Sequence, residues 1–400
     1  MSSIPQELRL LIEIMKIDNF DSSKTYLKDE LFADIDWEIF LLLAKHHRIY
    51  PLIYSKLKSI GEKRIPSHVL NALYQQYKNN TYYMLQLCGE MEQVSKLFTE
   101  NQISLIFLKG PVIAADIYGD ISLRTSKDLD ILIQINDLKK AEELLLTQGY
   151  KREEGSKTIY EWKWNKHHVT YFHLQKGIEI ELHWRLHPSP TKEPSFNELW
   201  ERKRVSMITS YPVYFLGKED LFLYLVTHGA RHGWFRLRWL ADIDQIIRKS
   251  IIIENNNVFL IQKHYLGKQV LILSSQVLNN PKTEEMKSFT GGKRSRRIAQ
   301  LAIFYIVEMG HSHINESKGE LAINDKHHLF SIKSNLQRSF VLNLYQFLIK
   351  SNLQRLIFVI KFFFPSSEDV KTLRLPKPIY FLYFPLRPFL WAWRKTRKPI

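Results

Sequence analysis

The sequence predicts an α/β (α+β) protein in which a mixed core lies between helical flanks. Apolar residues recur at helical spacing before about residue 100 and again after about residue 219. Between these regions the pattern changes to short apolar runs and to alternation of apolar and polar residues, which is typical of strands. The chain has 400 residues and a hydrophobic content of 45%, so it is long enough for more than one structural unit.

The flanks are predicted to be helical. Apolar residues lie three and four positions apart between Trp37 and Leu57. Ser67 is the expected cap of a long helix that runs toward Glu100. Helices are expected again from Asp220 to Arg248 and in further amphipathic segments to about residue 364. The predicted regions are an N-terminal helical region at 1–64, a core at 65–200, a C-terminal helical region at 201–374 and a tail at 375–400.

The core is predicted to alternate strands and helices. An apolar run ends at Gly110-Pro111, which indicates a buried strand followed by a helix with proline at its first position. Two alternating runs flank Lys176-Gly177, which predicts an antiparallel hairpin. The expected elements are a strand at Ile103 to Leu108, a helix at Pro111 to Tyr118, a strand at Asp128 to Ile133, a helix from Asn136-Asp137 to Gly149, and hairpin strands at Val169 to Leu174 and Ile178 to Trp184.

Two acidic residues stand at the start of an apolar strand, in the stretch R-T-S-K-D-L-D-I-L-I. Acidic residues are depleted in strands, because a half-buried position offers an ionised carboxylate no partner. Residues two apart project to one face, so Asp128 and Asp130 share a face while Leu129 and Ile131 share the other. Their Cβ atoms are expected roughly 6.5 to 7 Å apart, so both carboxylates can bind the same divalent ion.

The second hairpin strand repeats this pattern, with Glu179, Glu181 and His183 on one face. If the two strands are neighbours, three or four carboxylates converge, and such a cluster repels itself unless it binds cations. Mg²⁺ is the natural ion, with Mn²⁺ as an alternative, because it prefers carboxylate oxygen and substrate phosphates. The alternative interpretation is a set of surface salt bridges with Lys127 or Arg185.

A candidate phosphate site lies upstream of the aspartates. Lys109 and Gly110 end one strand and precede a helix, and the exposed N–H groups at such a helix start attract phosphate. Lys109 adds a positive charge, and Arg124 can bind phosphate through two parallel hydrogen bonds. A lysine and a glycine at a strand end are common in proteins, so this signal is weak when taken alone.

The order of these pieces resembles the uncharacterised nucleotidyltransferase family of bacteria, a branch of the polymerase-β-like superfamily. The resemblance covers most of residues 40–250, and it is specific as an ordered set although no single piece is. The pieces are Leu108-Lys109-Gly110, Tyr118-Gly119-Asp120, Arg124 with Asp128-Leu129-Asp130, Gly149-Tyr150, I-E-L-H-W at Ile180 to Trp184, and then His228, His232, Trp234 and Asp242.

The resemblance implies a polymerase-β-like nucleotidyltransferase core with a mixed sheet. It implies that Asp128, Asp130 and Glu181 are the catalytic and metal-binding residues, and that Glu181 helps to deprotonate an acceptor hydroxyl. It also implies that nucleotide is bound by Lys109, Gly110 and Arg124.

The phosphate turn departs from the pattern of the wider superfamily, which usually has Gly-Ser there. This chain has Gly110-Pro111, and proline has neither an N–H nor a hydroxyl group. A triphosphate must therefore use Gly110, later amides, Lys109 or Arg124.

The expected activity is transfer of a nucleoside monophosphate from an NTP to an acceptor hydroxyl, with release of pyrophosphate. The favoured acceptor is a small molecule or a peptide product. A formal net charge of +16 favours polyanionic partners, or else reflects a solvated basic surface. Two alternatives are an RNA- or protein-modifying nucleotidyltransferase of toxin type, and a non-catalytic nucleotide-binding or membrane-surface module.

The composition favours a cytoplasmic protein. Cys88 is the single cysteine, which excludes an internal disulfide and a cysteine-based zinc site. The first twenty residues show no signal peptide, and the apolar runs are too short to span a bilayer. The tail mixes aromatic residues with Arg387 and Arg394, a pattern that favours packing on the helical region over a peripheral membrane contact.

The remaining polar candidates carry weaker signals. His228 and His232 are four residues apart on an expected helix, and a structural or substrate-lining pair is favoured over a metal site. Asp242 is expected to cap a helix or to pair with Arg238. The pair His167-His168 precedes a strand and could face the site, but an exposed loop position is favoured because exposed loop histidines are commoner.

Overall fold

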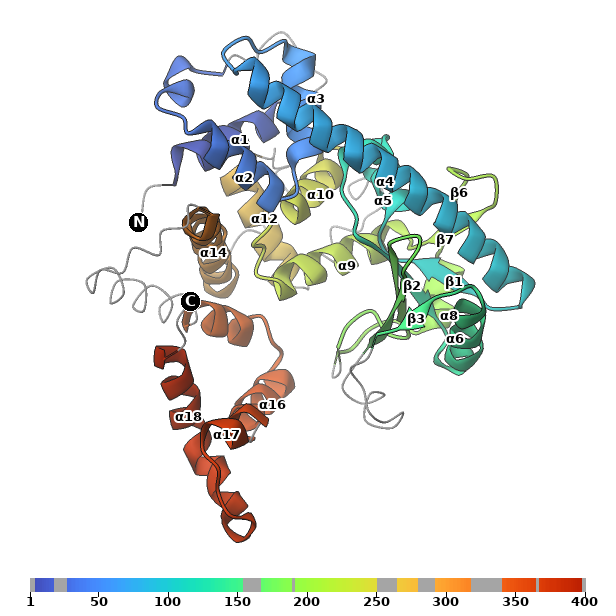
Figure 1. The fold of residues 1–400 in the computed structure, drawn as a ribbon, viewed down its shortest axis with the longest axis vertical. Coiled ribbons are helices and arrows are strands. Elements are labelled where there is room, and N and C mark those ends of the chain that lie inside the picture. Colours follow the sequence, from blue (N-terminus) through green and yellow to red (C-terminus); the bar gives the residue numbers. More distant parts are fainter. Residues whose placement is uncertain are drawn as a thin grey trace.

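The computed structural model describes residues 4–17, 27–153, 167–188, 191–249, 265–279, 292–317, 340–364 and 367–397. One sheet and its helices lie beside a group of N-terminal and C-terminal helices, and helix α4 runs along both parts (Figure 1). The helices are α1 (Gln6–Lys16), α2 (Trp37–His46), α3 (Tyr50–Ile60), α4 (Ser67–Glu100), α5 (Pro111–Tyr118), α6 (Leu138–Thr147), α8 (Phe196–Glu201), α9 (Lys218–Arg231), α10 (Leu237–Arg248), α12 (Tyr265–Leu278), α14 (Lys293–Ser317), α16 (Asn352–Phe363), α17 (Ser367–Thr372) and α18 (Tyr383–Arg397).

The described strands form one seven-stranded mixed sheet in the order β3-β4-β5-β2-β1-β7-β6. Strand β2 lies in the middle, antiparallel to β1 and parallel to β5, and β4 and β5 form the predicted hairpin. The mixed α/β class predicted from the sequence is therefore confirmed. The strands are β1 (Leu105–Phe107), β2 (Asp128–Ile133), β3 (Lys151–Arg152), β4 (His168–His173), β5 (Ile178–His183), β6 (Arg204–Ser206) and β7 (Val213–Phe215).

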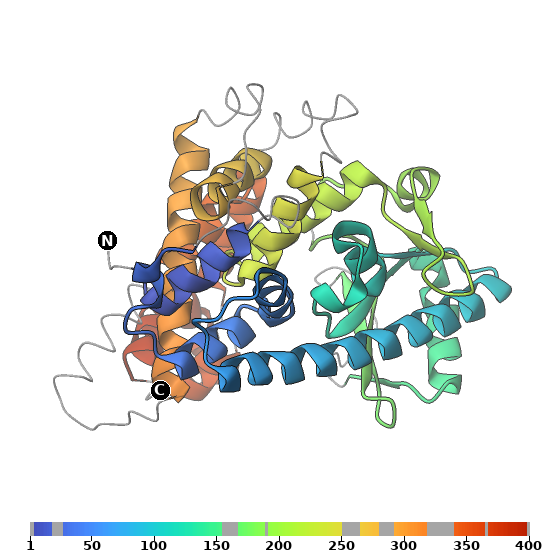
Figure 2. The same ribbon diagram turned by 90° about the horizontal axis from the view of Figure 1, so that it is seen from above.

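The turn from β1 into α5 has the geometry that its Gly-Pro pair favours. Gly110 has a φ of 96°, which a residue with a side chain rarely adopts, and Pro111 is the first helical residue. On the neighbouring side, α4 begins at Ser67 after Pro66, so Ser67 starts the helix instead of capping it. The long helix contacts β1, β2 and β7 and covers one face of the sheet (Figure 2).

The segment predicted to be helical from Asp220 to Arg248 is two helices, α9 and α10, separated by a tight turn. Gly233 and Trp234 both have positive φ values, of 67° and 58°. The Trp234 side chain is fully buried over Gly229, where a Cβ atom would lie 2.4 Å from the indole ring. The glycine therefore allows the tryptophan to fold back, and this contact ends the first helix.

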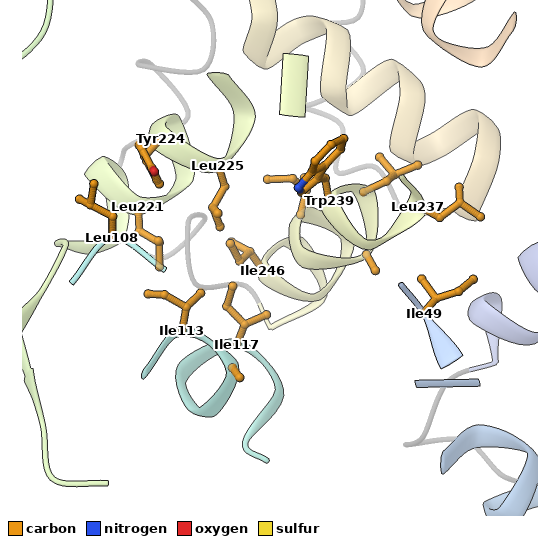
Figure 3. Packing of buried hydrophobic residues seen from close by; sticks show 14 of the residues in the cluster. Ile49, Leu108, Ile113, Ile117, Leu221, Tyr224, Leu225, Leu237, Trp239 and Ile246 are labelled. Carbon is orange, nitrogen blue, oxygen red and sulfur yellow. The ribbon is translucent and has the colours of Figure 1, made fainter. Parts of the chain in front are cut away.

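Helices α9 and α10 pack against α5. Figure 3 shows Ile113 and Ile117 of α5 next to Leu221, Leu225 and Ile246 of α9 and α10, and all five are buried. This apolar contact fixes α9 and α10 over the edge of the sheet where β1 ends. Side chains at the start of β2 therefore face these two helices.

The helical regions on either side of the core pack together, since α1 contacts α12 and α2 contacts α14. Strands β6 and β7 extend the sheet beyond the predicted core end at residue 200, because β7 pairs with β1. The other predicted boundaries stay predictions. Among the helices that the structure describes, none combines the length and the apolar character that a membrane crossing requires.

The described part of the basic aromatic tail, residues 375–397, contains α18, which contacts α16 and α17. Arg387 and Arg394 both pair with the buried carboxylate of Asp369 on α17, the second at 2.6 Å. Two of the tail's basic residues thus hold it to a neighbouring helix, in line with the packing interpretation. A membrane contact through this tail stays a prediction.

Candidate active site

The acidic residues of β2 and β5 lie in direct register. The two strands are parallel neighbours, in which Asp128 pairs with Glu179 and Asp130 pairs with Glu181. Neighbouring strands are about 4.8 Å apart, so side chains on the same face of such pairs meet. The alternation seen in the sequence therefore brings four carboxylates to one side of the sheet.

Two overlapping groups of side chains could hold metal ions. Ligand atoms of Asp128, Glu179 and Glu181 all lie within 4.8 Å of one another, and so do those of Asp130, Glu181 and His183. Carboxylate oxygens fit Mg²⁺ and Mn²⁺, whereas the imidazole nitrogen favours Mn²⁺ or another transition metal. The donor set therefore fits a divalent cation, with Glu181 shared between the groups.

Asp130 is fully buried and held by two basic partners. Its Oδ1 atom lies 2.9 Å from Nζ of Lys109 and 3.2 Å from Nε2 of His183. Burial opposes ionisation, but Lys109 and His183 outweigh it and hold the pKa of Asp130 well below its usual range. The same His183 nitrogen lies 3.1 Å from Oε2 of Glu181, so the imidazole bridges two carboxylates.

The pKa of Asp128 is shifted in the opposite direction from that of Asp130. Burial and the neighbouring charge of Asp130 raise its pKa to about 6, although Lys109 acts in the other direction. A larger fraction of Asp128 side chains is therefore protonated at a given pH than for an ordinary aspartate, and a metal ion that binds there has to displace this proton.

The raised pKa of Asp128 gives a testable pH dependence. The pKa of Asp128 is about 3.9 in the unfolded chain and about 6 in the folded protein. At pH values between these two, the folded state binds more protons than the unfolded state. The contribution of Asp128 to the free energy of unfolding therefore increases as the pH falls through 6. We expect the melting temperature of the metal-free protein, relative to that of Asp128→Asn, to rise between pH 7 and pH 5. A difference that is constant over this range would show that Asp128 ionises normally.

The carboxylates open into a pocket of about 270 Å³ between the sheet and helices α9 and α10. Among the described residues, six cationic side chains and three carboxylates line it. The carboxylates are Asp128, Asp130 and Glu181, and the cations are Arg48, Lys109, Lys127, Arg231, Arg236 and Arg238. An excess of cations beside these carboxylates suits a polyanionic ligand.

A family model matches the part of the chain that forms this pocket. The model described as "Uncharacterised nucleotidyltransferase" matches residues 33–272, which include the whole sheet and helices α9 and α10. The chain belongs to this nucleotidyltransferase family. Comparisons with curated proteins and with solved structures gave no match.

Within the nucleotidyltransferase core, Arg124 does not line the pocket. Its guanidinium is buried and forms two-pronged hydrogen bonds to Asp242, from Nε to Oδ1 and from Nη2 to Oδ2, both at 3.0 Å. Tyr118 also donates a hydrogen bond to Asp242, at 2.9 Å. This geometry argues against the predicted contact between Arg124 and phosphate, and Asp242 pairs with Arg124 where Arg238 was expected.

Arg124 instead fixes the loop that leads into β2. Asn80 of α4 donates to the carbonyl oxygens of Ser122, at 2.9 Å, and of Arg124, at 3.3 Å. Arg238 donates to the carbonyl oxygen of Thr125 on the same loop. The loop is therefore tied to α4 and α10, and its rigidity positions Asp128.

Four arginines that line the pocket were not predicted as site residues from the sequence, namely Arg48, Arg231, Arg236 and Arg238. Burial and the nearby guanidinium of Arg48 lower the pKa of Arg236 to about 10, and burial with Arg124 lowers that of Arg238 to about 9. Cations that repel one another in a partly dry pocket are stabilised by an anion. For Arg231, Arg236 and Arg238 their position in R-H-G-W-F-R-L-R could have drawn attention to them, whereas no motif marks Arg48.

The weaker histidine candidates also line this pocket. Burial lowers the pKa of His228 well below its usual range and that of His232 to about 4, so both are neutral at pH 7. His167 and His168 are not exposed loop residues: they lie beside His183, and the three have ligand atoms within 4.8 Å of one another. The antiparallel pairing of His168 with His183 across β4 and β5 explains this.

Proposed function

We propose that the protein transfers a nucleoside monophosphate from an NTP to an acceptor hydroxyl, with Asp128, Asp130 and Glu181 as the metal-binding carboxylates. The observation that carries this proposal is the register of β2 and β5, which pairs Asp130 with Glu181 directly. The family assignment supports nucleotidyl transfer as the class of reaction.

A bound Mg²⁺ or Mn²⁺ would supply charge stabilisation for the phosphates and orient them. Asp128, Asp130 and Glu181 would hold it, with Glu179 and His183 as further donors. During transfer the acceptor oxygen bonds to the α-phosphorus, the bond from the α-phosphorus to the bridging oxygen breaks, and pyrophosphate leaves. In this proposal Glu181 also accepts the hydroxyl proton, since its carboxylate belongs to the cluster beside which the acceptor oxygen would react.

The cationic side of the pocket would hold the triphosphate. Lys109 pairs with Asp130 and lines the pocket, and Gly110 directly precedes α5, whose first free amides come after Pro111. Arg48, Arg236 and Arg238 take over the phosphate contacts that the sequence suggested for Arg124. Negative charge grows on the leaving pyrophosphate, so fixed cations here stabilise the transition state.

The triphosphate assignment predicts a selective loss of nucleotide affinity. Charge-assisted hydrogen bonds contribute about 1.5 to 3 kcal/mol, so Arg236→Ala is expected to weaken binding of a non-hydrolysable NTP by about ten- to a hundredfold. Calorimetric titration with magnesium measures this. Arg297→Ala is the matched control, because Arg297 is exposed on α14 and its loss changes the net charge equally. Equal affinities in the two variants would place the phosphates elsewhere.

The proposed activity is tested by pyrophosphate release. The purified protein is incubated with each of the four NTPs, magnesium and fractions of a cell extract. We expect release that depends on one extract fraction and on one or two preferred NTPs. Nucleotide binding without release in any fraction would support a non-catalytic nucleotide-binding module instead.

A further inference from the structure

A second, larger cavity lies next to the candidate active site. Its volume is about 470 Å³, which is within the range of small-molecule pockets of roughly 300 to 1,000 Å³. Its apolar lining comes from segments far apart in the sequence, namely Leu186, Pro188, Leu223, Leu266, Ile349 and Ile357. Such a lining suits the apolar part of a ligand.

The two cavities share a wall made of Tyr224 and Arg231. The Tyr224 ring stacks on His187 of the second cavity, at 5.8 Å, and lies 6.0 Å from His228 of the active-site pocket. Arg231 Nη1 lies 3.3 Å from Nε2 of His167, on the active-site side. The Tyr224 and Arg231 side chains therefore stand between a ligand in the second cavity and the carboxylates of the active-site pocket.

The acidic residues of the second cavity are already neutralised. Asp220 accepts hydrogen bonds from Arg202 at 2.9 and 3.0 Å, and Glu193 accepts one from Arg185 at 2.9 Å. Because each carboxylate has an arginine partner, the cavity is not a second cation site. Its lining is mainly apolar, with the cationic side chains of Lys192, Arg231 and Lys350 in addition.

Part of the wall comes from outside the residues that the family model matches. Ile349 and Ile357 lie beyond residue 272, where the match ends. Two glutamines hold this segment on the core: Gln346 donates to the carbonyl oxygen of Arg231 at 2.6 Å, and Gln354 donates to the hydroxyl of Thr191 at 3.1 Å. The C-terminal helices thus complete a cavity that the matched region alone leaves open.

We propose that this cavity binds the apolar body of the acceptor, with the acceptor hydroxyl directed past Tyr224 toward Asp130 and Glu181. This inference rests on the proposed nucleotidyl transfer. The acceptor class is a small hydroxyl-bearing molecule with an aliphatic or aromatic body, or a peptide product with such a side chain. The segment from Gln346 to Ile357 selects the acceptor, while the matched core performs the transfer.

The proposal is tested with linear alcohols as probes. Butanol, hexanol and octanol are titrated against the fluorescence of bound anilinonaphthalene sulfonate. Each buried methylene strengthens binding about threefold to fourfold, so displacement should improve steeply with chain length. Ile357→Trp fills the cavity and should weaken octanol binding at least tenfold. Leu356→Trp is the matched control, because Leu356 is the preceding residue on α16 and is 58% exposed.

Three results decide the matter. A steep chain-length dependence that Ile357→Trp alone reduces supports the cavity as the binding site. A flat dependence, or an equal loss in both tryptophan variants, overturns it. The titration is repeated with Asp128→Asn, a substitution outside the cavity lining. If this variant binds octanol normally while the unmodified protein shows no nucleotidyl transfer, the proposed transfer function is wrong and the cavity assignment still holds.

Discussion

Asp128→Asn is expected to lower nucleotidyl transfer about a thousandfold, which corresponds to about 4 kcal/mol in the activation barrier. The amide keeps the shape of the side chain and removes the charge that a divalent ion needs. Folding should not suffer, because burial and Asp130 already disfavour the ionised form of Asp128. Steady-state pyrophosphate release and the melting temperature measure the two effects separately.

Asp130→Asn is the informative comparison, because it should lose both activity and stability. Asp130 is buried and pairs with Lys109 and His183, and breaking a buried pair from one side costs about 3 to 5 kcal/mol. Two neighbouring aspartates are thus expected to differ in stability but not in catalysis. Near-normal turnover of Asp128→Asn at saturating magnesium would falsify the metal assignment.

Arg124→Ala is expected to destabilise the protein by about 3 to 5 kcal/mol, because it leaves the buried carboxylate of Asp242 without its main partner. The loss should appear as a lower midpoint in denaturant-induced unfolding. The affinity of the protein for magnesium and for NTP should change only as far as the loop before Asp128 becomes more mobile.

The double variant Arg124→Met with Asp242→Leu separates the pair from its surroundings. Replacing both charges by apolar side chains of similar size removes the unpaired carboxylate, so it should recover most of the lost stability. If Arg124→Ala has the same unfolding midpoint as the unmodified protein but binds NTP weakly, Arg124 contacts phosphate. The role of Arg124 in positioning the loop before Asp128 would then be wrong.

The sequence was sufficient for the strands that carry the carboxylates. Alternation placed Asp128 with Asp130 and Glu181 with His183 on common faces, and the Lys176-Gly177 turn fixed the hairpin. Strands β6 and β7 escaped prediction because each has three residues, too few to show a period of two. The break between α9 and α10 is a local turn, in which Gly233 and Trp234 adopt positive φ values and Trp234 packs onto Gly229, five residues before it.

The phosphate side of the site could be predicted only in part. Lys109 was identifiable because it adjoins the strand end, whereas Arg48, Arg236 and Arg238 reach the pocket from segments that contact the core only in the folded chain. The prediction that Arg124 binds phosphate relied on its closeness to Asp128 in the sequence. The Arg124 side chain turns instead to Asp242, which is 118 residues away.

The most direct test of the account follows the two ends of the NTP. The protein is incubated with magnesium, cell extract and the preferred NTP, labelled either at the α-phosphate or at the γ-phosphate. We expect the α-label to enter an acceptor and the γ-label to leave in pyrophosphate, and we expect Asp128→Asn to give neither product. Transfer of the γ-label to an acceptor, or equal α-labelling by Asp128→Asn, would contradict this expectation.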